Sequence, residues 1–173
     1  MPGYDPRARK AMGLNWALSN MGANHNFGWP QQEIGDPKPR LLDPTDDEGQ
    51  GDVIKWNHDS TAALELAIAC IFPSHHLQLY DHELIGKMMA AATGVPKFAD
   101  VDYLFLVGDR IYNLERCFNV RDGFSRKDDK LPRRFLTEPL KGGVRDGQII
   151  RTPDKIIDQY YDLRGWDRNG IPT

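Results

Sequence analysis

Cysteine and histidine are the side chains of this 173-residue sequence best suited to bind a metal or move a proton, and it has two cysteines and five histidines. Cys70 and Cys117 form no CxxC ligand pair. They could form one disulfide, but nothing else indicates secretion, so we expect free thiols. His75, His76 and His82 lie close in sequence. Adjacent histidines cannot easily face one ion from a helix, and no cysteine completes a zinc spacing, so a solvated loop is favoured.

The elements that must position these residues are predicted to be helices. Start signals, stop signals and apolar periods predict about five helices, near residues 5–20, 52–72, 81–93, 100–119 and 153–165. This indicates an all-α, multihelical fold. The second helix is apolar almost all round in its C-terminal half, so it should be central. Leu66 and Cys70 should then be buried or face a missing partner. We also expect exposed apolar surface around this helix, because the missing partner should cover it.

Three further patterns concern the other elements. Residues 21–51 should form a long loop. The fourth helix carries a regular apolar stripe of Leu104, Val107, Ile111, Leu114 and Phe118. The charged residues over 121–134 could form a solvated loop, but their alternating signs favour a salt-bridged tie that pins this loop to neighbouring helices, with Asn113, Arg116 and Arg121 as members.

Composition excludes several classes of protein. Apolar residues make up 40% and charged residues 27%, as in ordinary globular proteins. The net charge of -3 offers no basic surplus for nucleic acid. The longest nearly apolar run, residues 67–73, is too short to cross a membrane. No signal peptide or basic amphipathic leader follows Met1, so we expect a cytoplasmic protein.

Several segments, in order along the chain, read as motifs. Residues 4–7 read YDPR, residues 19–25 read SNMGANH, residues 108–132 read GDRIYNLERCFNVRDGFSRKDDKLP, and the last segments read YYDLRGWD and GIPT. Together they resemble the aldehyde:ferredoxin oxidoreductase family over nearly the whole chain. The resemblance implies that residues 1–173 are the C-terminal helical domain of such an enzyme, a partial enzyme without the N-terminal pterin domain.

The resemblance also implies cofactors. Enzymes of this family hold a tungsten-bis-pterin centre beside a [4Fe-4S] cluster, oxidise aldehydes to carboxylic acids and pass the electrons to ferredoxin. The fourth cluster cysteine closes a DxxGLC segment that also touches the pterin. Residues 65–70, ELAIAC, stand at that segment, and only Cys70 matches, as the expected metal ligand. Glu65 and Ala69 replace the aspartate and leucine and are the other expected cofactor-binding residues, while Ile68 replaces the glycine.

His25 ends the segment that resembles the family's SNRGAxH, which implies a position near the tungsten and a catalytic role. Histidine titrates near neutral pH and could hold or relay a proton. The alternative is a loop histidine hydrogen-bonded to backbone, just as Cys70 could be a small buried apolar residue. Met21 stands where the family commonly has arginine, which leaves the substrate open.

Two functions remain open at this point. The chain could be part of an enzyme whose partners are the missing N-terminal part and ferredoxin, with a homo-oligomer as a further option. It could instead be a non-catalytic helical interaction module derived from that family. One matched cysteine cannot hold a cubane cluster, so we expect the isolated chain to carry neither cluster nor tungsten and to be inactive.

Overall fold

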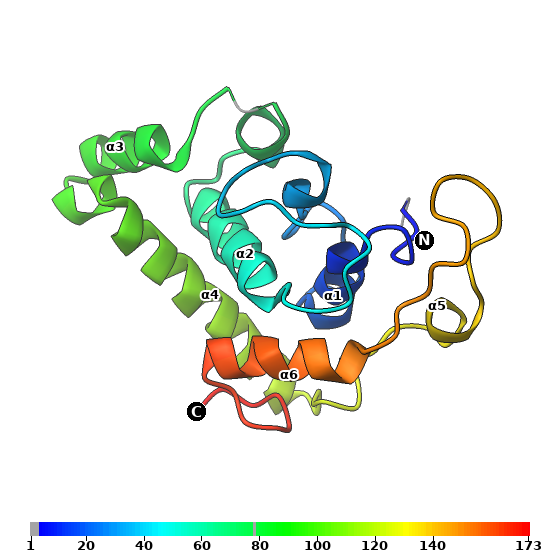
Figure 1. Cartoon of the computed structure of the whole chain (residues 1–173). Helices are drawn as coiled ribbons and strands as arrows, with labels where there is room; N and C mark the ends of the chain where they lie inside the picture. The colour runs from blue at the N-terminus through cyan, green and yellow to red at the C-terminus, as the bar shows by residue number, and fades with distance from the viewer. Residues whose placement is uncertain (1–3, 78) are drawn as a thin grey trace. The chain divides into compact units, whose positions relative to one another are not determined.

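The computed structural model describes residues 4–77 and 79–173, with the side chains of His75 and His76 outside that description. Its elements, in chain order, are α1 (Lys10–Leu18), η1 (Gln31–Ile34), α2 (Gly51–Leu66), the π-helical turn η2 (Phe72–His76), α3 (His82–Thr93), η3 (Pro96–Ala99), α4 (Val101–Arg121), α5 (Arg134–Thr137) and α6 (Pro153–Arg164) (Figure 1). Within the described residues there is no strand, only an isolated bridge between Trp166 and Pro172. The predicted all-α, multihelical fold is confirmed.

The chain divides into two compact units. The terminal unit contains the residues up to Asn57 together with Arg116–Thr173, and the central unit is His58–Glu115. The boundaries fall inside α2 and α4. His25 therefore belongs to the terminal unit, whereas Cys70 belongs to the central unit.

α1 begins at Lys10, later than the predicted start near Asp5. The Asp5 carboxylate does not cap a helix, because it accepts hydrogen bonds from the backbone N–H and the guanidinium of Arg7, at 2.6 to 3.0 Å. These bonds lower the pKa of Asp5. Every residue of α1 is buried, even Lys10, whose ammonium lies 2.5 Å from a carboxylate oxygen of Asp47. A helix buried on all sides gives no one-sided apolar period, so its sequence locates its ends poorly.

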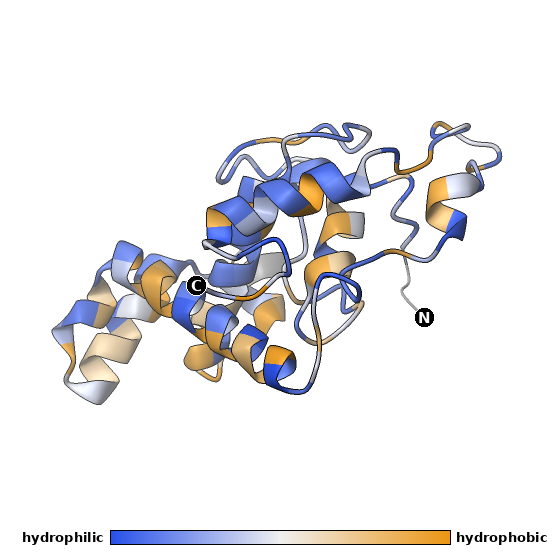
Figure 2. Ribbon diagram, turned by 90° about the horizontal axis from the view of Figure 1, so that it is seen from below, coloured by the Kyte–Doolittle hydropathy of each residue, from blue (hydrophilic) through white to orange (hydrophobic). Residues whose placement is uncertain are grey.

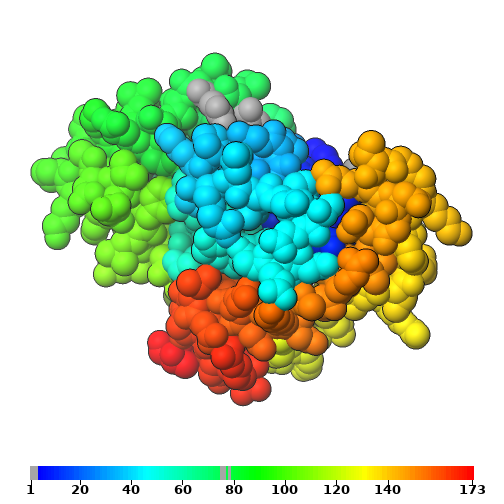
Figure 3. All heavy atoms as spheres, in the orientation of Figure 1, coloured from blue at the N-terminus to red at the C-terminus, as the bar shows by residue number. Residues whose placement is uncertain are grey.

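The predicted loop between α1 and α2 is confirmed apart from the short η1. Much of it lies at the molecular surface, where Figure 3 shows it in light blue to cyan. None of the helices in the described part of the chain is long and apolar enough to cross a bilayer.

In the central unit, α3 begins and ends where the sequence predicts. The side chain of Asp81 caps it by accepting a hydrogen bond from the Leu84 N–H at 2.9 Å, and Gly94 ends it with φ 72°. α3 then packs beside η3 (Figure 1). α4 approaches α2 at Gly108, where a Cβ atom would lie only 2.1 Å from the Asp59 carbonyl oxygen. Only glycine permits this approach.

The apolar stripe of α4 is not a single buried face. Leu104 is buried, but Leu114 and Phe118 are exposed, while the buried residues include Gly108 and Tyr112. Figure 2 shows hydrophobic and hydrophilic residues alternating along the helices. Other large apolar side chains exposed in the central unit are Leu66, Ile68, Phe72, Leu77, Leu79, Leu84, Met88, Val95 and Leu106. The predicted exposed apolar surface is found at the C-terminal end of α2 and just beyond it, at Leu66, Ile68 and Phe72, whereas the earlier aliphatic residues of α2 are buried.

The predicted salt-bridged tie lies in the terminal unit and has Arg116 as its centre. Its guanidinium donates to both carboxylate oxygens of Asp129, at 2.8 and 2.5 Å, and to the Gly170 carbonyl at 2.8 Å. The hydroxyl of Tyr161 donates to the same carboxylate. Arg121 is not part of the tie, because it is exposed and pairs with its neighbour Asp122.

Candidate functional site

The loop that carries Cys70 begins where α2 ends, at Leu66, well before the predicted end near Phe72. Ile68 has φ 55°, and the N–H groups after Leu66 bond back to the carbonyls of Leu64 and Glu65 at 2.8 to 3.4 Å. This closes the helix as a glycine cap usually does. The helix is shorter than predicted, and the alternative in which it buries Leu66 and Cys70 is wrong, because Leu66 is 38% exposed and the Cys70 thiol is exposed. The other alternative, that both residues face a missing partner, stays a prediction.

The left-handed backbone at Ile68 bears on the resemblance to DxxGLC. Ile68 stands at the glycine position of that motif, and glycine is the residue that adopts a positive φ without steric cost. A β-branched side chain there costs roughly 1–2 kcal/mol. Residues 65–70 therefore keep a backbone conformation that suits the glycine, although an isoleucine occupies the position.

We expect Ile68→Gly to stabilise the chain. The side chain is 95% exposed, so little burial is lost. Relief of about 1–2 kcal/mol of strain outweighs the roughly 0.5–1 kcal/mol that glycine costs through the unfolded state. Urea unfolding should show a net gain of roughly 0.5–1 kcal/mol. Ala67→Gly, at a neighbour without positive φ, should lose stability instead. An Ile68→Gly chain less stable than the wild type would contradict the strain argument.

Glu65 lies in the last turn of α2, and Ala69 lies between Ile68 and Cys70. Burial, and then the like charge of Glu115, raise the pKa of the Glu65 carboxyl. Within the described residues this carboxylate has no hydrogen-bond or ion-pair partner, so it is available as an acceptor. That fits a hydrogen bond from a pterin amine, with a reach one methylene longer than that of aspartate. Ala69 is half-buried and offers only its backbone and a methyl group.

Cys70 itself is a free thiol on an exposed loop, tied down by a hydrogen bond from the Tyr80 hydroxyl to its carbonyl oxygen at 3.0 Å. An accessible thiolate fits the role of one iron ligand. In the part of the chain that the structure describes, no group of three or more histidine, cysteine or acidic side chains could hold a metal ion.

The other candidate ligands do not join Cys70. Cys117 is exposed and free, and the prediction of two free thiols is confirmed. His82 lies with its Nε2 2.8 Å from the Ser60 hydroxyl oxygen. The metal-binding alternative that combined it with His75 and His76 falls on side chains outside the described residues.

His25 is half-buried in the terminal unit and packs against two aromatic rings. Its ring centroid is 5.5 Å from that of Tyr4 and 6.1 Å from that of Trp29. The backbone hydrogen bond that the alternative interpretation requires is not found for this imidazole among the described residues. Among the described residues, ring packing against Tyr4 and Trp29 holds the side chain in place.

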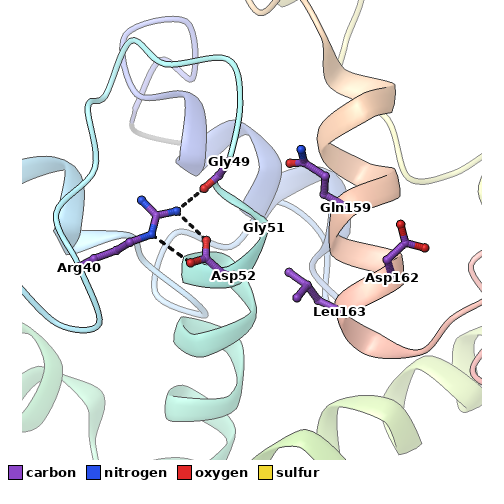
Figure 4. A pocket seen from close by; sticks show the side chains of 7 residues that line it. All are labelled: Arg40, Gly49, Gly51, Asp52, Gln159, Asp162 and Leu163. Atoms are coloured by element: carbon purple, nitrogen blue, oxygen red, sulfur yellow. Dashed lines mark hydrogen bonds and ion pairs between the residues drawn. The ribbon is translucent and has the colours of Figure 1, made fainter.

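A groove of about 410 Å³ opens in the terminal unit between the start of α2 and α6, and no sequence pattern predicted it. Figure 4 shows the residues that line it, which are Arg40, Gly49, Gly51, Asp52, Gln159, Asp162 and Leu163. Its charges are already paired. Arg40 donates to both carboxylate oxygens of Asp52, at 3.0 and 2.7 Å, and Asp162 pairs with Arg168 at 2.9 Å. Burial alone would raise the pKa of Asp52, but the bonds from Arg40 lower it.

Comparison with known proteins places this helical chain among the oxidoreductases. A family model described as "Aldehyde ferredoxin oxidoreductase, domains 2 & 3" matches residues 1–173. The chain therefore belongs to the aldehyde ferredoxin oxidoreductase family and corresponds to its domains 2 and 3.

The chain is similar to curated relatives named tungsten-containing aldehyde ferredoxin oxidoreductase. It is 37% identical to the protein of Pyrococcus horikoshii, 36% to that of Thermococcus kodakarensis and 34% to that of Pyrococcus furiosus. Each match covers 98% of this chain but only 27% of the relative. The chain thus spans about a quarter of the length of the relatives that it matches.

Proposed function

We propose that this chain supplies one [4Fe-4S] ligand, part of the pterin cradle and a substrate-side histidine to an aldehyde-oxidising tungsten enzyme that reduces ferredoxin. The observation that carries the proposal is the turn over residues 65–70. It presents an exposed Cys70 thiol directly after a left-handed residue at the glycine position of DxxGLC. Membership of the family and the printed names of the relatives supply the reaction class.

Each residue has a distinct part in this proposal. The Cys70 thiolate binds iron, and the Glu65 carboxylate accepts a hydrogen bond from the pterin. When bound, the tungsten-pterin centre would supply a two-electron acceptor, and the cluster would supply the path of those electrons to ferredoxin. A hydrated aldehyde loses two electrons and two protons as it becomes the carboxylic acid; His25 would receive one of those protons at an imidazole nitrogen, and the other would leave to solvent.

The rest of the enzyme is the main proposed partner. Family relatives are several times longer than this chain, and the apolar side chains exposed around the end of α2 need a cover. We assign that cover to the part of the polypeptide that holds the other cluster ligands. Ferredoxin is the proposed electron acceptor, and a homo-oligomer is a further proposed assembly.

His25→Gln should slow turnover of the assembled enzyme by about a hundredfold, the lower end for a lost acid–base group. Glutamine keeps a polar side chain of similar size but cannot exchange a proton near neutral pH. Steady-state rates with a simple aldehyde, normalised to bound iron, measure the effect. Iron content should be unchanged, because His25 is not a cluster ligand. A variant that turns over at the wild-type rate would remove the catalytic role from His25.

The test of the whole proposal is reconstitution. The chain alone should bind no stoichiometric iron, since it contributes one thiolate. The same chain co-expressed with the remaining part of a family enzyme should yield a complex that contains about four irons, the content of one [4Fe-4S] cluster. The alternative function, a non-catalytic interaction module, is favoured by the altered DxxGLC segment, in which only the cysteine is retained. This alternative predicts that the complex assembles but that its iron content does not depend on this chain.

A further inference from the structure

The rings around His25 form a cluster that is itself clamped from one side. Tyr4 and Trp29 lie with their centroids 5.3 Å apart, and the His25 imidazole packs against both. The guanidinium carbon of Arg9 lies 5.8 Å from the centroid of Tyr4 and 5.7 Å from that of Trp29. One cation therefore holds two rings at once by cation–π attraction. We call Tyr4, His25 and Trp29 the ring cluster.

Arg9 is fixed in turn by two oxygen acceptors. Its Nη2 donates to the Pro30 carbonyl at 2.8 Å, and its Nε donates to a carboxylate oxygen of Glu33 at 3.1 Å. The Arg9 side chain is 14% exposed and that of Glu33 is fully buried. Two bonds at different nitrogens define the plane of the guanidinium, so its position over the rings is set by Pro30 and Glu33 rather than by solvent.

Glu33 has a second structural part. Arg9 occupies the N-cap position of α1 and makes no side-chain cap bond. The other carboxylate oxygen of Glu33 accepts a hydrogen bond from the Ala11 N–H at 2.9 Å. A residue distant in sequence thus satisfies a free N–H at the start of the helix, where a negative charge is also favoured by the helix dipole.

We propose that Glu33 and Arg9 are positioning residues for His25, and that protonation of Glu33 loosens the clamp on the ring cluster. This inference deepens the proposed function, because it rests on the catalytic role given there to His25. The ionised carboxylate attracts the Arg9 guanidinium, whereas a neutral carboxyl keeps at most a weaker hydrogen bond. The clamp is then tight at high pH and loosens as pH falls.

The groups that face Glu33 set where this change occurs. Burial raises its pKa to about 7, against the opposing effects of the Arg9 charge and the N–H groups of Ala11 and Met12. Lys10, the neighbouring cation on α1, is paired with Asp47 instead. Because the pKa is raised from 4.5, stability from this group is present below pH 4.5 and is lost as pH rises to about 7. Tightening the clamp and stabilising the fold therefore run in opposite directions with pH.

The first test is NMR on the full chain without cofactor. The wild type should show NOEs from the ring protons of His25 to those of Tyr4 and Trp29. Arg9→Gln removes the cation, so these NOEs should disappear while the rest of the spectrum remains that of a folded chain. Arg126→Gln, which removes a guanidinium 5.0 Å from the ring of Tyr161, is the matched control and should keep them. Unchanged NOEs in a folded Arg9→Gln chain would overturn the proposal.

A titration keeps the proposal testable if Arg9→Gln does not fold. In a His25→Gln chain, which has no imidazole beside Trp29, the carboxyl carbon of Glu33 and the indole N–H of Trp29 should share a midpoint at about pH 7. Adding Glu33→Gln should abolish the inflection of Trp29. If the indole chemical shift of Trp29 did not change over the Glu33 titration, the proposed link between Glu33 and the ring cluster would be refuted. Neither experiment needs turnover, so a failed clamp and a failed catalytic role of His25 are separate results.

Discussion

Cys70→Ser should remove most of the iron from a complex of this chain with the rest of a family enzyme, and with it the reduction of ferredoxin. The exposed thiol at the end of the 65–70 turn is the only side chain of the DxxGLC-like segment that matches the family. A serine hydroxyl is a hard, weakly acidic ligand and a poor substitute for thiolate on iron. Iron and acid-labile sulfide per complex, together with the visible absorption of the cluster, measure the loss.

Cys117→Ser is the matched control for that substitution. Both cysteines are free and exposed, so the two variants remove the same chemical group from similarly accessible positions. Iron content should fall in Cys70→Ser and stay at the wild-type level in Cys117→Ser. If the Cys70→Ser complex kept the wild-type iron content, the ligand assignment would be refuted, and the interaction module would be the better account of the chain.

The parts of the fold that the sequence predicted are those fixed by local signals. Asp81 and Gly94 bound α3 as expected, and Pro153 and Gly165 bound α6. Each of these acts within one helical turn, so neighbouring residues are enough to find it. The start of α1 was misplaced because the carboxylate of Asp5 bonds to Arg7, while the N-terminus of the helix is satisfied by Glu33.

The site was harder to predict because its geometry depends on contacts that are distant in sequence or contrary to propensity. No scale favours isoleucine in a left-handed conformation, so the turn at Ile68 that follows the end of α2 left no signal, and Cys70 was placed in a helix. His25 was found through a motif, but its neighbours Tyr4 and Trp29 become visible only once the chain is folded. Arg9 and Glu33, which clamp those rings, carry no motif at all.

Asp129→Ala should cost the chain about 3–5 kcal/mol of unfolding free energy, the range for removing one member of a buried ion pair. Arg116 is 3% exposed at its side chain and Asp129 is 6% exposed, so the alanine variant leaves a buried guanidinium without its counter-charge. The Tyr161 hydroxyl, whose pKa is raised by burial and by its bond to Asp129, loses its acceptor as well.

The shape of this region leaves little room for rearrangement after that loss. The guanidinium of Arg116 lies 4.8 Å from the ring centroid of Trp166, and a Cβ on Gly170 would come within 2.4 Å of the same guanidinium. Urea unfolding of Asp129→Ala against Glu48→Ala separates burial from charge. Glu48 pairs with Lys155 at 2.6 Å, but both side chains are more than half exposed. That exposed pair should be worth at most about 1 kcal/mol. If the two variants lost equal unfolding free energy, solvent rather than the fold would stabilise the Arg116 charge, and the tie would add no more stability than an exposed ion pair.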